Sequence, residues 1–195
     1  GVNITTVYDI GANKGEWAAE ASKYLSGSEF YLFEANSTHI KSLERSGFDF
    51  FITALSNKVG SREFFSTGGT GDSFYKELTH HYENVEARVV ETNTLNNLVR
   101  SKGLKIPQLI KIDTQGSELD ILRGSTDFLD KVAFVYMECP VDEHNEGSPK
   151  FDDYIYFMKH NGFVPSEVGE IHRRSIDAKF VQFDILSYNA KLLTS

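Results

Sequence analysis

The sequence is poor in cysteine, with Cys139 as its single thiol. One cysteine excludes an intrachain disulfide framework and is typical of a reducing compartment, so we expect a cytoplasmic protein. No apolar run approaches the roughly 20 residues that a membrane-spanning helix needs, and the first residues have no signal-peptide pattern. The sequence therefore predicts neither a disulfide-stabilised scaffold nor a membrane span.

Positive charge is also scarce. The chain has 20 Lys and Arg against 28 Asp and Glu, and its formal net charge is −8. Affinity for phosphate backbones depends on clustered Lys and Arg, so we expect no nucleic-acid partner. The length suits one domain, and no repeat or linker divides residues 1–195, which we predict to be a single domain. Because the chain lacks an initiator methionine and begins just before its first predicted strand, this interpretation leaves room for a missing N-terminal segment.

A glycine turn near the N-terminus is the first candidate site. A β-rich run at residues 5–8 ends in Asp9 and passes through Gly11 and Gly15 into a helix-forming segment that starts at Glu16. Glycine permits a sharp turn close to a ligand, and a helix N-terminus directs free N–H groups at the turn. A pyrophosphate site needs the spacing G-x-G-x-x-G, whereas an acid before Gly11-x-x-x-Gly15 suits an ammonium or sulfonium group. An ordinary turn without a ligand is the alternative.

Carboxylates occur at four of the five predicted strand ends. They are Asp9, Glu34, Asp113 and Glu138. Ligands of open α/β sheets bind outside the carboxyl ends of the strands, and an acid about 20 residues after the glycine turn often binds a ribose. Glu34 has nearly that spacing, although a solvated carboxylate is the other interpretation. The third predicted strand, 48–55, ends near Ser56, where an adenine ring would fit.

Three further features bear on substrate binding, on metal binding and on the topology of the sheet. Residues 67–73 form a glycine-rich loop, which we interpret as a lid or substrate loop, with a plain linker as the alternative. The adjacent histidines 80 and 81 have no partner at zinc-ligand spacing, so we predict no metal site there. The C-terminal strands 170–172 and 180–186 have no crossover helix between them, which predicts an antiparallel hairpin at the end of a mostly parallel sheet.

Several segments together resemble the FkbM-type S-adenosylmethionine-dependent methyltransferases. They are DIGANKGEW (9–17), FEAN (33–36), ALSN (54–57), TLNNL (94–98) and LIKIDTQGSELDILRG (109–124). The last segment is the most specific, because it is similar to the family signature K-I-D-x-E-G-x-E-x-x-x-L-x-G. The resemblance covers residues 5–187. It implies an α/β, Rossmann-like class I methyltransferase fold with a mostly parallel seven-stranded sheet and a C-terminal antiparallel hairpin, and O-methylation of a hydroxyl on a sugar or small metabolite.

The resemblance also implies a binding site for S-adenosyl-L-methionine. The methionine part would be held by Asp9, Gly11, Asn13 and Gly15, the ribose by Glu34, and the adenine near Ala54, Leu55 and Ser56, with Asp113 beside the methyl-transfer site. We accordingly expect Gly11→Val to abolish cofactor binding without unfolding the protein. Two departures occur: Gln115 stands where the family usually has Glu, and Asn96-Asn97 replaces an acidic pair. The replacement at Gln115 puts in doubt a contact to the substrate or to a cation at this position.

The chemistry of methyl transfer indicates which groups to look for. The protein must hold an acceptor oxygen about 3 Å from the methyl group and help to remove its proton. Asp113 is the first candidate catalytic base, or else a group that orients the hydroxyl; Glu138 is the second candidate, and histidine 80, 81 or 144 the third. Asp113 and Glu138 could instead bind Mg²⁺, although spacing alone gives this little support.

Two other functions stay open at this point. A catalytically inactive, nucleoside-binding Rossmann-like module would keep the pocket and transfer nothing. A nicotinamide-dependent oxidoreductase is disfavoured by the glycine spacing and by the absence of a Tyr-x-x-x-Lys pair.

Overall fold

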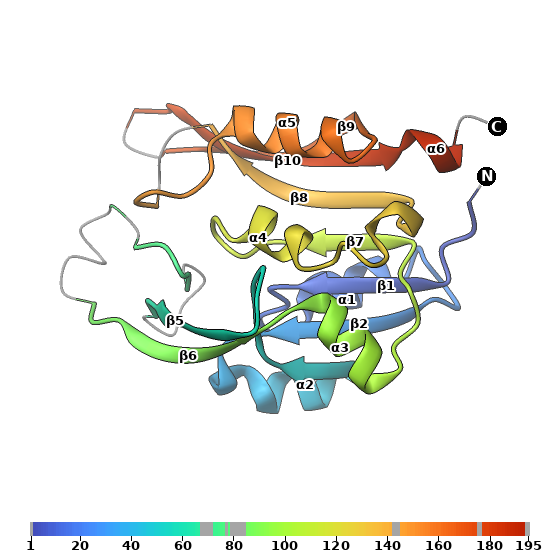
Figure 1. Ribbon diagram of the computed structural model, residues 1–195, viewed down its shortest axis with the longest axis horizontal. Coiled ribbons are helices and arrows are strands. Elements are labelled where there is room, and N and C mark those ends of the chain that lie inside the picture. The colour runs from blue at the N-terminus through green and yellow to red at the C-terminus, as the bar shows by residue number, and fades with distance from the viewer. Residues whose placement is uncertain are drawn as a thin grey trace.

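A seven-stranded sheet forms the centre of the molecule, with the strand order β3-β2-β1-β7-β8-β10-β9. The computed structural model describes residues 2–66, 72–76, 78, 85–141, 145–174 and 177–193. The strands of this sheet are β1 (Thr6–Ile10), β2 (Glu29–Glu34), β3 (Asp49–Ile52), β7 (Leu109–Ile112), β8 (Phe134–Pro140), β9 (Phe163–Arg173) and β10 (Phe180–Asn189). The first five are parallel, whereas β10 is antiparallel to both β8 and β9 (Figure 1). The predicted sheet and its antiparallel hairpin are confirmed.

Helices cover both faces of the central strands. They are α1 (Glu16–Ala21), the 3₁₀ turn η1 (Ser37–His39), α2 (Ile40–Ser46), α3 (Leu95–Lys102), α4 (Glu118–Arg123), the 3₁₀ turn η3 (Leu129–Lys131), α5 (Phe151–His160) and α6 (Ala190–Leu193). Side chains alternate along a strand, so Tyr8 packs in the core beneath α3, α4 and α5, while Val7 packs in the core beneath α1 and α2. All five residues of β1 are buried, as expected for a central parallel strand.

The helix starts and stops follow the capping residues that the sequence contains. The hydroxyl of Thr94 accepts a hydrogen bond from the N–H of Asn97 at the start of α3, and Gly103 ends that helix in the left-handed region. The segment 94–98 thus forms the capped start of α3. Helix α1 starts at Glu16, as the sequence indicates, and ends at Ala21, where the chain continues into turns.

The third predicted strand, 48–55, is wrong as a single element. Strand β3 ends at Ile52, and the N–H of Thr53 donates to the carbonyl of Glu34 at 2.7 Å. The next residues form β4 (Ala54–Leu55), which pairs with β6 (Arg88–Asn93) in a second sheet. Strand β5 (Gly60–Phe64) completes this sheet, in the order β4-β6-β5. The chain changes sheets here because β6 supplies the hydrogen-bond partners of β4.

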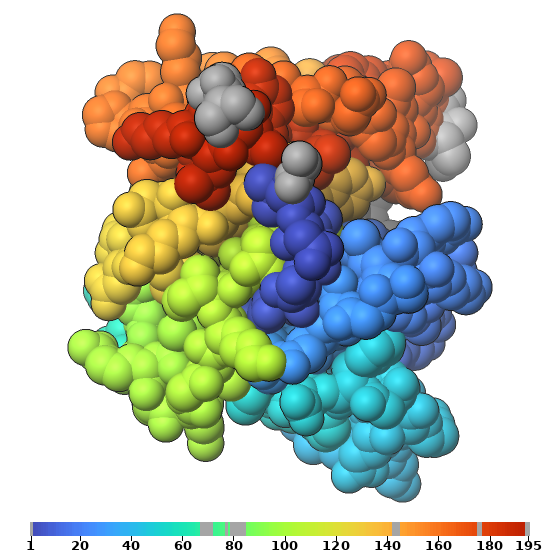
Figure 2. Space-filling view, turned by 90° about the vertical axis from the view of Figure 1, so that its right-hand side faces the viewer, coloured from blue at the N-terminus to red at the C-terminus, as the bar shows by residue number. Residues whose placement is uncertain are grey.

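The carboxyl ends of the parallel strands lie at the left of Figure 1, whereas both chain ends lie at the right, toward the amino ends of these strands. Figure 2 views that opposite side, where the N-terminal residues in dark blue lie near the centre of the surface. Within the part of the chain that the structure describes, no helix has the length and apolar character needed to cross a bilayer.

Candidate active site

A cavity of about 940 Å³ opens at the carboxyl ends of the central strands. Its volume lies at the upper end of the range for small-molecule sites. Seven of the predicted site residues line it: Gly11, Asn13, Glu34, Ala54, Leu55, Asp113 and Glu138. The other three, Asp9, Gly15 and Ser56, are not among the lining residues, and each has a structural role described below.

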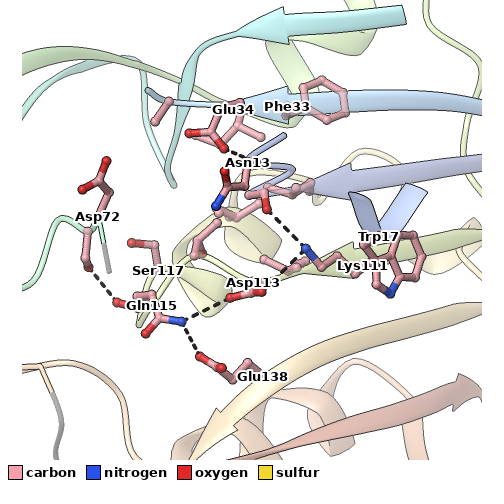
Figure 3. A pocket seen from close by; sticks show the side chains of 18 of the residues that line it. Asn13, Trp17, Phe33, Glu34, Asp72, Lys111, Asp113, Gln115, Ser117 and Glu138 are labelled. Carbon is pink, nitrogen blue, oxygen red and sulfur yellow. Dashed lines mark hydrogen bonds and ion pairs between the residues drawn. The ribbon is translucent and has the colours of Figure 1, made fainter. Parts of the chain in front are cut away.

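Glu34 is fixed at the end of β2 by two backbone donors. The N–H of Asn13 donates to its Oε2 and the N–H of Asn36 to its Oε1, both at 2.7 Å. Asn13 is held in the left-handed region, with φ of 50°, which directs its N–H toward Glu34 (Figure 3). Each carboxylate oxygen can accept a further donor. This arrangement suits two adjacent hydroxyls, as on a ribose.

An apolar wall lies next to Glu34. Ala54 and Leu55 of β4 line the cavity together with Phe33, Phe64, Phe74, Ile112 and Ile121. Such a wall suits a planar base. Tyr75 does not offer a free ring for stacking on an acceptor, because its hydroxyl donates to Asp120 at 3.2 Å and its ring lies beside the guanidinium of Arg62.

Three buried polar atoms at the cavity have no hydrogen-bond partner among the described residues: Asn13 Oδ1, His39 Nδ1 and Ser117 Oγ. All three residues line the cavity. Buried polar atoms are nearly always paired in native proteins, so a ligand with several hydrogen-bonding groups would complete the site. Together with Glu34 and the apolar wall, these atoms fit the adenosyl and amino-acid parts of S-adenosylmethionine.

Asp9 is fully buried within β1 and pairs with Lys111 of β7, with 3.1 Å between Nζ and Oδ1. Burial raises the pKa of the Asp9 carboxyl, and Lys111 opposes this rise. Burial alone would lower the pKa of Lys111, but Asp9 and Asp113 raise it, so the lysine stays charged. Its Nζ also donates to the carbonyl of Gly11 at 3.2 Å. Asp9 therefore acts on the cavity through Lys111 rather than by lining it.

Gly11 is required by the fold, which corrects one expectation. Its φ is +72°, and a Cβ at this position would lie 1.8 Å from the carbonyl oxygen of Asp113. The expectation that Gly11→Val leaves the protein folded is therefore wrong, because the added atoms would collide with the backbone after β7. Gly15 starts α1 with φ of +82° and packs against Leu32. Ser56 is buried behind the cavity, where its Oγ accepts a hydrogen bond from Arg62 at 3.2 Å.

Asp113, Gln115 and Glu138 form the opposite end of the site. The amide Nε2 of Gln115 donates to Asp113 Oδ1 at 3.2 Å and to Glu138 Oε2 at 2.8 Å (Figure 3). Glu138 lies within β8, not after it, because the strand continues to Pro140. Burial and the neighbouring carboxyls raise the pKa of Glu138 to about 9, so it is protonated at neutral pH. An Mg²⁺ bound by both acids would have to displace the amide that bridges them.

A polar face of the C-terminal strands completes this end, and the sequence interpretation missed it. Tyr136 and Glu138 of β8, Glu170 and His172 of β9, and Gln182 and Asp184 of β10 all line the cavity. Asp184 lies opposite Glu138, and Gln182 lies opposite both His172 and Pro140. The alternation of Gln182 and Asp184 with buried Phe183 and Ile185 was the signal for this face. The candidate histidines 80, 81 and 144 and most of the glycine-rich loop lie outside the described residues.

Two aromatic rings also line the cavity, Trp17 of α1 and Tyr136 of β8. They are stacked with 6.3 Å between ring centroids. Lys111 Nζ lies 5.8 Å from the Trp17 centroid, a favourable cation–π geometry. Trp17 therefore contacts the cation of the buried pair of Asp9 and Lys111.

Glu118 stabilises the loop that carries Asp113 and Gln115. Its carboxyl is buried and accepts the N–H groups of Thr114 at 2.9 Å and Gly116 at 3.0 Å, together with the hydroxyl of Tyr154 from α5. Burial raises the pKa of Glu118, and these donors oppose the rise. Its role is therefore to hold the loop.

Known proteins share both the sequence pattern and this fold. Residues 9–165 match the family model of the methyltransferase FkbM domain. The 2-O-methyltransferase NoeI of Sinorhizobium fredii is 28% identical over an alignment of 161 residues. The match covers 72% of this chain and 65% of NoeI, so the chain spans slightly less than two thirds of that relative.

Solved structures support the same assignment at the level of the fold. Magnesium protoporphyrin IX methyltransferase of Synechocystis, with bound SAM, has a TM-score of 0.54 at 8% identity, covering 94% of this chain and 69% of that one. TrmK of M. capricolum, in complex with S-adenosyl-homocysteine, has a TM-score of 0.51 at 11% identity, covering 95% and 62%. A putative tRNA methyltransferase of Streptococcus pneumoniae has a TM-score of 0.51 at 13% identity, covering 95% and 64%. With the family match over most of its length, the chain belongs to the FkbM domain family of S-adenosylmethionine-dependent methyltransferases.

Proposed function

We propose that this protein transfers a methyl group from S-adenosylmethionine to a hydroxyl oxygen of a sugar or another small metabolite. The observation that carries the proposal is a single cavity with two chemically different ends: Glu34 beside an apolar wall, and a carboxyl-rich face around Asp113. The distant similarity to a protein named as a 2-O-methyltransferase supports oxygen as the acceptor atom.

At the cofactor end, the predicted residues that line the cavity have defined tasks. Glu34 binds the ribose hydroxyls, and Ala54 and Leu55 contact the adenine. Asn13 and the backbone of Gly11 bind the methionine part, with Lys111 placed behind them by Asp9. The bound cofactor supplies a methyl group on a sulfonium sulfur, so the protein has mainly to align the acceptor oxygen with it.

At the acceptor end, Asp113 orients the hydroxyl. Its side chain is 47% exposed at the cavity, and it is kept in place by Gln115. Lys111 lies 3.8 Å away, and the role we propose for Asp113 is to accept a hydrogen bond from the hydroxyl. The carboxyls of this face suit hydroxyl or amine groups and repel phosphate. We therefore propose a small, non-anionic acceptor rather than nucleic acid, and a cytoplasmic site of action.

Calorimetric titration with S-adenosylhomocysteine, with NADH as the control ligand, tests the cofactor site. We expect micromolar binding of the nucleoside and none of NADH. Transfer of a labelled methyl group is then measured with neutral glycosides, amino sugars, uronic acids, phenols and RNA as acceptors. Binding of the nucleoside without turnover on any acceptor would favour the inactive module, and methylation of RNA alone would refute the small-molecule acceptor.

Asp113→Asn tests the acceptor end. The variant keeps a hydrogen-bonding group of the same size, so affinity for S-adenosylhomocysteine should stay within a few fold while turnover falls by at least about tenfold, because a neutral amide accepts less strongly from the hydroxyl. Unchanged turnover would remove Asp113 from the chemistry.

A further inference from the structure

His172 lies on the polar face of β8, β10 and β9, among the carboxyl groups of the acceptor end. One imidazole nitrogen and one oxygen each of Glu138 and Asp184 lie within 4.8 Å of one another. The Nε2 atom of His172 is 3.7 Å from Glu170 Oε2, and the His172 side chain is 41% exposed. It lines the same cavity as Asp113. The histidine is therefore accessible to an acceptor and lies beside the carboxyl groups of Glu170 and Asp184.

We propose that His172 is the base that takes the proton of the acceptor hydroxyl, with Asp184 and Glu170 stabilising the imidazolium that forms. This inference rests on the proposed O-methyl transfer. The acceptor oxygen bonds to the methyl carbon while the carbon–sulfur bond breaks and leaves its electron pair on sulfur. The hydroxyl proton moves to the neutral imidazole and is later released to water. No further reactant is needed.

The other groups at this end are poorly suited to accept a proton near neutral pH. Glu138 already carries one, since its pKa is raised to about 9. Burial raises the pKa of the Tyr136 hydroxyl, which donates to Asp184 Oδ2 at 2.7 Å. Asp113 already accepts a hydrogen bond from Gln115 and lies 3.8 Å from Lys111. Among the described cavity residues, His172 is the group at this end whose charge changes most readily in this pH range.

The surroundings determine how the imidazolium is held. The titratable and charged groups that line this end of the cavity with His172 are Glu170 on its own strand, Asp184 on β10, Glu138 and Tyr136 on β8, Lys111 on β7, and Asp113 directly after β7. His172 lowers the pKa of Asp184 whereas burial raises it, so the two groups are coupled. A charged Asp184 in turn stabilises the protonated imidazole. Lys111 adds little repulsion because Asp9 pairs with it.

NMR titration of the histidine rings in the free protein tests the inference without any cofactor. The His172 resonances are assigned by their loss in His172→Gln. We expect a ring that titrates between pH 5 and 9, and a lower midpoint in Asp184→Asn, because the imidazolium loses a neighbouring carboxylate there. A ring that does not titrate between pH 5 and 9, or a midpoint unaffected by Asp184→Asn, would overturn the proposed pair.

Kinetics then test the base itself. In the wild type, kcat/KM should rise with pH through the His172 midpoint. His172→Gln should lower kcat at least about 100-fold, abolish this pH step and leave affinity for S-adenosylhomocysteine within about twofold. The control is His160→Gln, on the exposed end of α5, which should behave as wild type. Turnover retained by His172→Gln, or a rise near pH 9 that Glu138→Gln removes, would refute His172 as the base.

Two further outcomes separate the alternatives. Loss of activity with EDTA, restored by Mn²⁺ together with a shift of the His172 resonances, would make His172 a metal ligand with Glu138 and Asp184 and refute the proposal. Absence of turnover in the wild type on every acceptor would refute the proposed function and the base together, whereas turnover in both wild type and His172→Gln would refute the base alone.

Discussion

The buried ion pair of Asp9 and Lys111 gives the sharpest prediction. Lys111→Met keeps the length of the side chain and its contact with Trp17 but leaves Asp9 without its cation. Removing one partner of a buried pair typically costs about 3–5 kcal/mol. Protonation of Asp9 limits the loss, because keeping an ordinary aspartate neutral at pH 7 costs about 4 kcal/mol. We therefore expect the free energy of unfolding to fall by about 3–4 kcal/mol at pH 7.

The pH dependence has a definite sign. Burial already raises the pKa of folded Asp9 above its unfolded value, and removal of Lys111 raises it further. The folded variant then binds more protons than the unfolded chain at pH values above the ordinary aspartate pKa, so its stability decreases as pH rises through that window. At pH 5 the cost of a neutral aspartate is only about 1.5 kcal/mol, so the deficit of the variant should shrink accordingly.

Urea unfolding of wild type and Lys111→Met at pH 5, 7 and 8 measures this deficit. Asp9→Asn/Lys111→Met, which removes both charges, should recover most of the loss. The matched control is Lys105→Met, because Lys105 forms an exposed pair with Glu29 and should show no measurable change. A deficit below about 1 kcal/mol at pH 7, as for a surface pair, or an equal deficit at pH 5 and 7, would refute the reasoning.

Three other substitutions test the turn, the ribose site and the loop support. Gly11→Ala should lower stability by more than about 3 kcal/mol, whereas Gly27→Ala, with a positive φ but no atom within 4 Å of the added Cβ, should lose about 1 kcal/mol; similar losses in urea unfolding would argue against the clash. Glu34→Gln should weaken S-adenosylhomocysteine binding at least about tenfold by calorimetry, and unchanged affinity would remove the carboxylate from the site. Tyr154→Phe removes a donor to buried Glu118 and should cost about 2–3 kcal/mol. This loss should be larger at pH 8 than at pH 5, because the folded-state pKa of Glu118 would rise further; a pH-independent loss would contradict this role.

Local patterns in the sequence predicted much of the fold. Strand β7 follows from the apolar run 109–112, and helix α4 from the segment between Glu118 and Gly124. Both elements are predictable because a few neighbouring residues carry the hydrophobic pattern of a strand or helix and the glycine that ends the helix. The position of Glu34 at the end of β2 was predicted for the same reason. These features depend on neighbours along the chain, so the sequence alone identifies them.

The parts that sequence reasoning missed depend on contacts between distant segments. Lys111 faces Asp9 because the register of two parallel strands places them side by side, and no local pattern reports that register. The clash that requires Gly11 comes from the carbonyl of Asp113, across the same pair of strands. His172 stayed unassigned because the C-terminal strands were used only to predict an antiparallel hairpin from the missing crossover helix, and not to ask which cavity their polar side chains would line.

Gln115 connects the departure from the family signature with the chemistry of the acceptor end. A glutamate at this position, as the signature usually has, would place a third carboxylate within hydrogen-bond reach of Asp113 and Glu138, and such a group of like charges needs a cation or added protons. The amide instead donates to both acids, and Glu138 keeps its proton. The amide thus joins the two acids without adding a third negative charge to this end. The base that we propose for methyl transfer, His172, lines the same end of the cavity.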